Sequence, residues 1–201
     1  MDINVRRLRC ILGWLAMALP WLSVLFTMLF GKLGWPASIS ITYYYPTAFP
    51  VFLIILGAAS TMLFAYKGYE TVDDIVNSIA ATFGLMILLF PTVHSKYPIT
   101  GAFGIPSNIS NIIHMISAIA FFGLLSFNSL FLFTKSSGEM TKGKKLRNII
   151  FRVCGVGMLA SFLLLFIPSN YIVWIVETIA LAFFGISWLT KANCYKWLAA
   201  D

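Results

Sequence analysis

The sequence predicts an all-α membrane protein, a single domain over residues 1–201 with six transmembrane helices and both termini in the cytoplasm. Hydrophobic residues make up 60% of the chain and charged residues 10%, and the mean hydropathy is +0.89. A soluble domain carries about 25% charged residues, so this composition does not fit a protein surrounded by water. The apolar residues also fall in blocks long enough to cross a bilayer, and the basic residues fall mainly between alternate blocks.

Each block has about the twenty residues that a transmembrane helix needs. The first one follows a basic start, as in a secretory signal, but its apolar run continues well past the small residues Ala16 and Ala18 and is therefore expected to stay as a helix. Pro20 is expected to bend this helix. The expected spans are residues 10–30, 47–66, 75–93, 111–134, 148–167 and 171–190.

The connection between the first two spans is rich in aromatic residues. Trp35 and the run Tyr43, Tyr44 and Tyr45 fit the aromatic belt found where a membrane meets water. The other connections are polar or contain Gly and Pro, as expected of turns and loops, and they cover residues 67–74, 94–110, 135–147 and 168–170.

The basic residues indicate the orientation. With the N-terminus in the cytoplasm and six alternating spans, only Lys32 and Lys96 of the fourteen basic residues fall outside. This is the positive-inside pattern, and it explains the net charge of +7 without nucleic acid as a partner. The expected location is the cytoplasmic membrane, and the expected partners are membrane lipids. The sequence does not indicate an oligomeric state.

The three cysteines fit the same orientation. Cys10, Cys154 and Cys194 all lie at or near the predicted cytoplasmic ends of helices, where a disulfide is not expected to persist. No pair of them has the spacing of metal ligands.

The polar residues most suited to chemistry converge near the predicted outer surface. His94 ends the third span and His114 lies about 4.5 Å into the fourth, at 1.5 Å per residue. Glu177, the one carboxylate in the middle of a span, lies about 9 Å into the sixth by the same rise. A charged group inside a membrane usually faces the bundle interior or a wet cavity, so Glu177 is a candidate for a functional site.

Several residues could complete a site around His114 and Glu177. Ser110 and Ser117 share the helix face of His114, at i−4 and i+3. A histidine oriented by a carboxylate is a general base, and a nearby serine such as Ser117 could then act as a nucleophile. His94, Ser110 and the tyrosines at positions 43, 44 and 45 are candidates for lining the same pocket.

Three other uses of these residues remain open. His94, His114 and Glu177 could together hold a metal ion, although no spacing motif supports it and no metal is predicted. A buried Glu177 could carry protons or ions in transport. Glu177 and one histidine could also simply join two helices by a hydrogen bond. The sequence contains no HExxH motif, no GxSxG motif and no Gly-rich phosphate loop.

A second polar group lies at the predicted inner surface. Asp73 and Asp74 open the third span, where the helix dipole favours carboxylates, and Thr71 or Asp73 could cap that helix. Arg152 lies just inside the fifth span, so a structural ion pair between Asp74 and Arg152 is expected.

Six stretches together resemble an uncharacterised family of small bacterial six-span membrane proteins. They are SISITYYYP, FAYKGYETVDD, LLFPT, His114 at the start of its span, SLFLFTK, and the Glu177 helix that ends in GISWLTK. The resemblance covers nearly the whole chain, and more distantly the chain is similar to the DRAM/Sfk group of six-span proteins. It implies a six-span fold but no assigned chemistry.

The functional hypothesis is a polar pocket at the outer leaflet that handles a lipid or small amphiphile, with His114 and Glu177 as its centre and catalysis as one use. The alternatives are a small transporter or channel component and a scaffold that binds partner helices.

Overall fold

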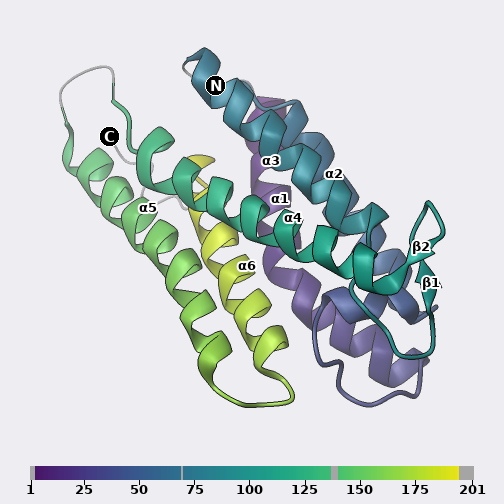
Figure 1. Ribbon diagram of the computed structural model, residues 1–201. Helices are drawn as coiled ribbons and strands as arrows, with labels where there is room; N and C mark the ends of the chain where they lie inside the picture. Colours follow the sequence, from purple (N-terminus) through teal and green to yellow (C-terminus); the bar gives the residue numbers. More distant parts are fainter. Residues whose placement is uncertain (1–2, 69, 137–139, 195–201) are drawn as a thin grey trace.

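A computed structural model describes residues 3–68, 70–136 and 140–194, which form a bundle of helices (Figure 1). The long helices are α1 (Ile3–Leu25), α2 (Phe49–Phe64), α3 (Thr71–Leu89), α4 (Ser107–Phe127), α5 (Lys142–Ser161) and α6 (Ile172–Lys191). The shorter elements are the π-helical turns η1 (Phe26–Phe30) and η3 (Asn128–Leu132), the 3₁₀ turns η2 (Ser40–Tyr44) and η4 (Phe162–Phe166), and the antiparallel strands β1 (Ile99–Thr100) and β2 (Ile105–Pro106).

The all-helical architecture predicted from the apolar blocks is confirmed. Five helices, three of them extended by a π or 3₁₀ turn, are long and apolar enough to cross a membrane: Val5–Phe30, Thr71–Leu89, Ser107–Leu132, Lys142–Phe166 and Ile172–Lys191. Helix α2 is equally apolar but has 16 residues. At 1.5 Å per residue it measures about 24 Å, less than the roughly 30 Å of a bilayer core.

The helix boundaries differ from the expected spans where local chemistry intervenes. Helix α3 ends at Leu89 instead of residue 93, because Pro91 cannot continue a helix. Helix α4 begins at Ser107, within the expected loop, directly after the small β1–β2 hairpin. Helix α3 is capped by Glu70 instead of Thr71 or Asp73, and the Asp73 side chain completes the capping box.

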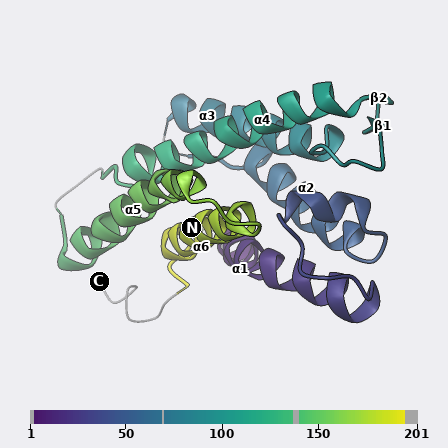
Figure 2. The same ribbon diagram turned by 60° about the horizontal axis from the view of Figure 1, so that its bottom comes forward.

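The six helices form a closed ring. Each helix packs against its neighbour in sequence, and α6 packs against α1 as well as α5 (Figure 2). Two glycines allow the close crossing of α1 and α6. A Cβ on Gly185 would lie 2.7 Å from the carbonyl oxygen of Gly13, so neither position has room for a larger residue.

The two ends of the bundle hold different connections between the helices (Figure 1). One end, here called the basic end, holds the start of α1, the end of α6, the α2–α3 turn and the start of α5. The other end, here called the aromatic end, holds the η2 connection, the β1–β2 hairpin and the η4–α6 turn. Tyr44 stacks on Tyr97 at the aromatic end, and His94 contacts both rings.

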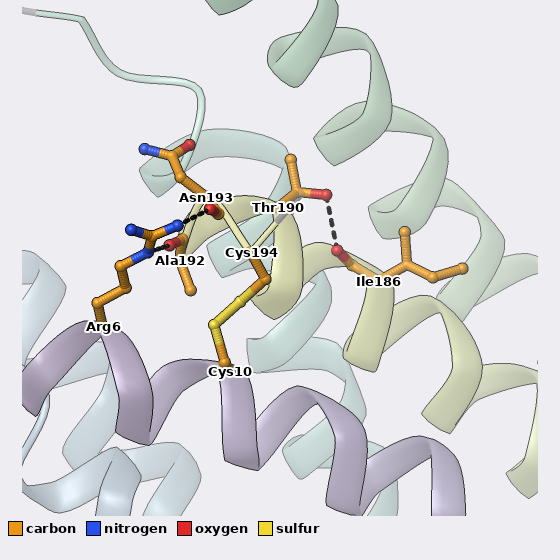
Figure 3. The surroundings of a disulfide bond; sticks show 7 residues. All are labelled: Arg6, Cys10, Ile186, Thr190, Ala192, Asn193 and Cys194. Carbon is orange, nitrogen blue, oxygen red and sulfur yellow. Dashed lines mark hydrogen bonds between the residues drawn. A yellow bond between two sulfur atoms is a disulfide. The ribbon is translucent and has the colours of Figure 1, made fainter. Parts of the chain in front are cut away.

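A disulfide joins α1 to the end of α6 at the basic end (Figure 3). Cys10 and Cys194 are bonded, with 6.1 Å between their Cα atoms. One turn earlier on α1, Arg6 donates hydrogen bonds to the carbonyl oxygens of Ala192 and Asn193. The expectation of no disulfide was wrong, because the antiparallel packing of the first and last helices brings these two cysteines together. Cys154 is buried and unpaired.

Candidate functional site

Glu177 lies on the face of α6 that looks into the ring. Its Oε2 accepts a hydrogen bond from the backbone N–H of Ile39 at 2.5 Å, and its Oε1 lies 2.8 Å from the Oγ of Ser40. Glu177 is partly buried as a residue, and it lines a cavity. The mid-span carboxylate therefore contacts the connection that follows α1.

His114 reaches the same serine from α4. Its Nε2 lies 3.0 Å from the Oγ of Ser40, and its Nδ1 lies 2.9 Å from the carbonyl oxygen of Phe90. The imidazole is only 3% exposed. The structure thus brings His114 and Glu177 together, with the hydroxyl of Ser40 between them.

The segment around Ser40 is held in place by its own hydroxyl groups. The N–H of Ile41 donates to the Oγ of Ser38, and the Oγ1 of Thr42 donates to the carbonyl oxygen of Ile39 at 2.6 Å. The first turn of a helix has N–H groups without partners inside the helix, and one of them, on Trp174 of α6, donates to the carbonyl oxygen of Ala37. These contacts dock the segment on the start of α6.

The end of α3 fixes the imidazole from the other side. Its last carbonyl groups have no partners inside the helix, as at every helix end. The carbonyl oxygen of Leu89 accepts from the N–H of Ala102, that of Phe90 faces His114, and that of Pro91 accepts from the Oγ of Ser110. Ser110 and one ring nitrogen of His114 therefore satisfy two of these carbonyl groups.

A cavity of about 270 Å³ lies beside this cluster, and its walls are mainly apolar. Ser38, Thr92 and Asn170 add polar groups to the end that holds Ser40, His114 and Glu177. The apolar lining comes from α1, the segment before η2, α2, α3, α4, η4 and α6, and comprises Leu19, Ala37, Ile39, Phe52, Leu56, Ile87, Met115, Ala118, Phe121, Phe122, Phe162, Leu165, Val173, Val176 and Leu181.

The cavity has exposed residues along one side of its lining. Met115 on α4, Leu165 on η4 and Val173 on α6 line the cavity and are also exposed on the outer surface of the bundle, at 44%, 40% and 42%. They mark a mouth between α4, η4 and α6. An apolar chain could enter through it without crossing the polar end.

The other predicted pocket residues lie outside this cavity. Ser117 is buried and its Oγ has no hydrogen-bond partner within the described residues, but Ser40, not Ser117, lies beside His114. The Tyr44 hydroxyl donates to the carbonyl oxygen of Thr92 at 2.6 Å. Burial raises the pKa values of both Tyr43 and Tyr44, so these phenols stay protonated at neutral pH. Tyr45 is partly buried beside them.

The alternative metal site is not formed. His94 is held at the aromatic end by Tyr44 and Tyr97, and its Nδ1 accepts a hydrogen bond from the N–H of Lys96. Among the described residues, no group of three His, Cys, Asp or Glu side chains is placed to hold a metal ion.

The expected ion pair of Asp74 with Arg152 is wrong. Asp74 pairs with Lys67 at 3.0 Å and accepts from the N–H of Gly68, while Arg152 is exposed on α5. The reason is the ring order: α3 packs on α2 and α4 and does not adjoin α5. Asp73 instead meets Lys135 at 3.2 Å.

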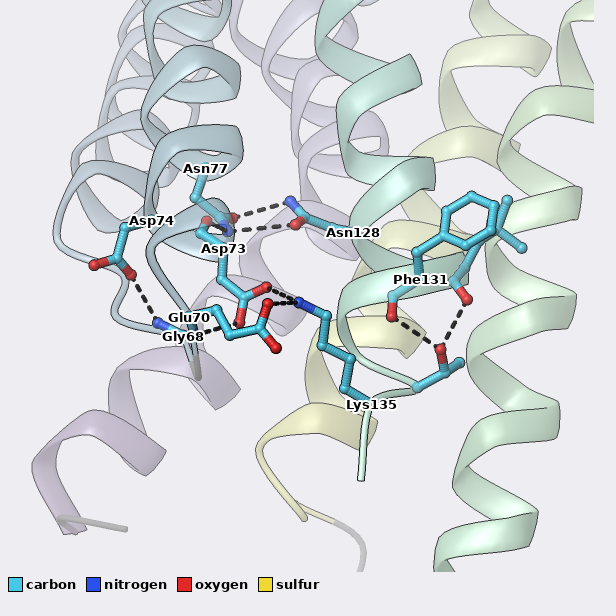
Figure 4. Close-up of polar contacts among 10 residues, drawn as sticks. Gly68, Glu70, Asp73, Asp74, Asn77, Asn128, Phe131 and Lys135 are labelled. Atoms are coloured by element: carbon cyan, nitrogen blue, oxygen red, sulfur yellow. Dashed lines mark hydrogen bonds and ion pairs between the residues drawn. The ribbon is translucent and has the colours of Figure 1, made fainter. Parts of the chain in front are cut away.

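Lys135 joins a larger group at the basic end, here called the basic-end cluster (Figure 4). Lys135 lies 2.9 Å from Glu70, and this hydrogen bond is the main cause that raises the pKa of Lys135. Asn77 donates to the backbone carbonyl of Asp73, and its amide exchanges two hydrogen bonds with that of Asn128. Asn128 begins the π-helical turn η3.

Sequence reasoning missed Ser40 and the carbonyl oxygen of Phe90. The one signal in the sequence was the alternation of Ser38, Ser40 and Thr42 with isoleucines, in a connection otherwise rich in aromatic residues. No pattern in the sequence indicated which of these hydroxyl groups would face Glu177.

Comparisons of the chain with protein-family models, with curated proteins and with solved structures find no match. The functional argument therefore depends on the geometry of the cavity and its polar end.

Proposed function

We propose that this chain crosses the cytoplasmic membrane of a bacterium six times, with the basic end in the cytoplasm. The five long apolar helices support membrane insertion, and α2 completes the even number of crossings. The fourteen basic residues support the orientation, because all but Lys32 and Lys96 belong to segments assigned to the basic end.

The orientation can be tested with single cysteines. In a Cys10→Ser and Cys194→Ser background, Lys96→Cys at the aromatic end should react with a membrane-impermeant maleimide in intact spheroplasts. Lys142→Cys at the basic end should react only after permeabilisation. The reverse pattern would overturn the orientation.

We propose that the function of the chain is to bind a lipid-like molecule or small amphiphile in the cavity. The observation that carries this proposal is that Ser40, His114 and Glu177 form one polar end of an otherwise apolar cavity with a lateral mouth. Pockets for drug-sized ligands measure about 300–1,000 Å³, so a volume of about 270 Å³ suits a single alkyl chain better than a two-chain lipid.

The lining of the cavity favours binding over transport. A transport path would continue with polar groups from Glu177 toward Asn128 and Arg152. Below Glu177 the wall consists of apolar side chains such as Phe121 and Leu181, and Asn128 is not among the lining residues.

A cavity-filling substitution tests the proposal. Ala118 of α4 lines the cavity, whereas Ala120 on the same helix does not. Ala118→Phe should weaken the binding of decanol, measured by calorimetry on protein in phosphatidylcholine nanodiscs, by at least about tenfold, or about 1.4 kcal/mol. The matched control Ala120→Phe should bind like the parent protein. Equal binding by both variants would refute the cavity as the site.

Catalysis by Ser40 is the second candidate, favoured by one observation. The carbonyl oxygen of Phe90 can only accept, so Nδ1 of His114 carries a proton, and Nε2, 3.0 Å from Ser40, is free to act as a base toward the hydroxyl. Hydrolysis of a decanoyl ester that is lost in Ser40→Ala and kept in Ser117→Ala would support this use of the pocket, and equal loss in both would refute it.

A further inference from the structure

The hydrogen bonds of the polar end require a fixed number of protons. Two contacts meet at Ser40, one to Nε2 of His114 and one to Oε1 of Glu177, and each contact needs one hydrogen. The hydroxyl supplies one hydrogen and can donate it in one direction only. The second hydrogen must come from Nε2 of His114 or from the carboxyl group of Glu177.

Two forms satisfy this count. In one, a protonated Glu177 donates to Ser40, and Ser40 donates to a neutral His114. In the other, a doubly protonated His114 donates to Ser40, and Ser40 donates to the carboxylate of Glu177. The two forms differ by the transfer of one proton through the hydroxyl group, and in both the pair carries no net charge. Removal of that proton leaves two acceptors facing one hydroxyl hydrogen, which breaks one of the contacts.

Within the described residues, His114 of α4 and Glu177 of α6 are the only titratable or charged groups that line the cavity. The lining from α1, residues 37–40, α2, the end of α3, Thr92, η4 and Asn170 contributes none. Tyr43 and Tyr44 of η2 lie outside the lining, as do His94 beyond α3 and the charged residues of the basic end. A charged ligand head therefore meets one acid and one imidazole, with no lysine or arginine to pair with an anion.

We propose that the ligand of this cavity is a single-chain amphiphile with a primary ammonium head, and that its binding releases the proton shared by His114 and Glu177. This inference rests on the proposed function. An ammonium group has three N–H donors and no acceptor. One donor can pair with the carboxylate of Glu177 and a second with Nε2 of a neutral His114, while Ser40 continues to donate to Glu177.

The exchange balances in charge and in hydrogen bonds. The alkylammonium cation enters, one proton leaves to water, and the pocket stays neutral as a whole. An N–H group of the ammonium provides the hydrogen for the hydrogen bond that the departing proton had made. An anionic head would require the opposite, an additional proton so that His114 is charged while Glu177 is neutral. A quaternary ammonium head has the charge but no N–H donors, so it cannot replace the proton.

A series of ligands with one chain and different heads tests the inference on the unmodified protein. Decylamine, decanol, decyl phosphate and decyltrimethylammonium are titrated into protein in phosphatidylcholine nanodiscs by calorimetry, in two buffers of different ionisation enthalpy, with protein-free nanodiscs as the blank. We expect decylamine to bind tightest and to release close to one proton, so that its affinity rises about tenfold per pH unit while the pair holds its proton. Decanol should bind more weakly, with no proton exchange.

The outcomes separate the inference from the proposed function. Proton uptake, no proton exchange with decylamine, or tightest binding of decyl phosphate would overturn the ammonium inference while leaving an amphiphile pocket in place. Failure of all four ligands to bind above the blank would overturn the proposed function itself.

The substitution Glu177→Gln gives an independent test. A glutamine can accept from the N–H of Ile39 and donate to Ser40, which then donates to His114, so it reproduces the neutral form without a removable proton. Decylamine should lose both its advantage over decanol and its proton release. An unchanged decylamine response in this variant would refute the role of the carboxylate. Should the variant fail to fold, the ligand series on the unmodified protein decides alone.

Discussion

The bundle contains two buried polar groups of similar size, and they differ in what they border. At the basic end, Asp73, Asn77, Asn128 and Lys135 bond to one another and to Glu70, and none of them lines the cavity. Near the aromatic end, the trio Ser40, His114 and Glu177, here called the cavity trio, is equally well connected but faces an apolar cavity.

The difference teaches how to separate a structural polar group from a candidate site. Burying polar groups is costly unless they are hydrogen-bonded, and both groups meet that requirement. The basic-end cluster joins α3 to η3 and to the connection after η3 by hydrogen bonds and an ion pair within the protein. All three residues of the cavity trio also line a volume that a ligand can occupy. Loss of a member should therefore affect stability in the first group and ligand binding in the second.

The largest expected effect belongs to the cavity trio. Glu177→Gln should weaken decylamine binding by about 100-fold, since hydrogen bonds to a charged group contribute about 1.5–3 kcal/mol and about 2.7 kcal/mol corresponds to that ratio. The midpoint of thermal unfolding in detergent should stay within the error of the parent protein. A variant that fails to insert or unfolds in mild detergent would instead assign Glu177 to helix packing.

A smaller effect, on stability alone, is expected at the basic end. Asn128→Leu leaves the amide of Asn77 buried without its reciprocal partner, which should lower the free energy of unfolding by about 1–3 kcal/mol. Denaturant titration of the helical signal measures this change. Decanol and decylamine binding should be unaffected, and altered binding would show that the two polar groups are coupled.

A double substitution sharpens the same point. Removing both partners of a buried hydrogen bond can be nearly neutral, so Asn77→Leu combined with Asn128→Leu should recover part of the stability that either single variant loses. A double-mutant cycle from the four unfolding curves gives the coupling between the amides. The double variant could instead lose as much stability as the two single variants together. That result would mean that the two amides act through separate contacts, for instance that of Asn77 with the carbonyl oxygen of Asp73.

The smallest effect concerns pH at the exposed edge of the basic-end cluster. The pKa of Lys135 is raised in the folded state, chiefly by its hydrogen bond to Glu70, so the stability it adds is fully present below its ordinary value of 10.5. That stability should be lost as the pH rises above this value. The difference in melting temperature between the parent protein and Lys135→Met should be constant from pH 7 to 9 and shrink above about pH 10.5. A difference that shrinks on acidification instead would assign the effect to the carboxylates.

The sequence allowed the helices and the approximate depth of two site residues to be predicted. Apolar blocks of about twenty residues indicated the long helices, and their alternation placed His114 and Glu177 near the same end. Helix boundaries were less accurate, because the β1–β2 hairpin and Pro91 decide where α3 ends and α4 begins.

The partners of these residues could not be predicted. Ser40 meets Glu177 through a connection without helical or strand periodicity, whose path depends on tertiary contacts such as that of Ala37 with α6. Asp74 was assigned to Arg152 because the order of helices around the ring was unknown. The same missing information hid the contact between the first and last helices that pairs Cys10 with Cys194.

The contact between α1 and α6 determines on which side the bundle can open. Gly13 and Gly185 allow α1 and α6 to pack closely. The Cys10–Cys194 disulfide joins the same two segments at the basic end. On the side of the mouth, α4 and α6 have little direct contact, so a guest molecule can enter there without separating α1 from α6.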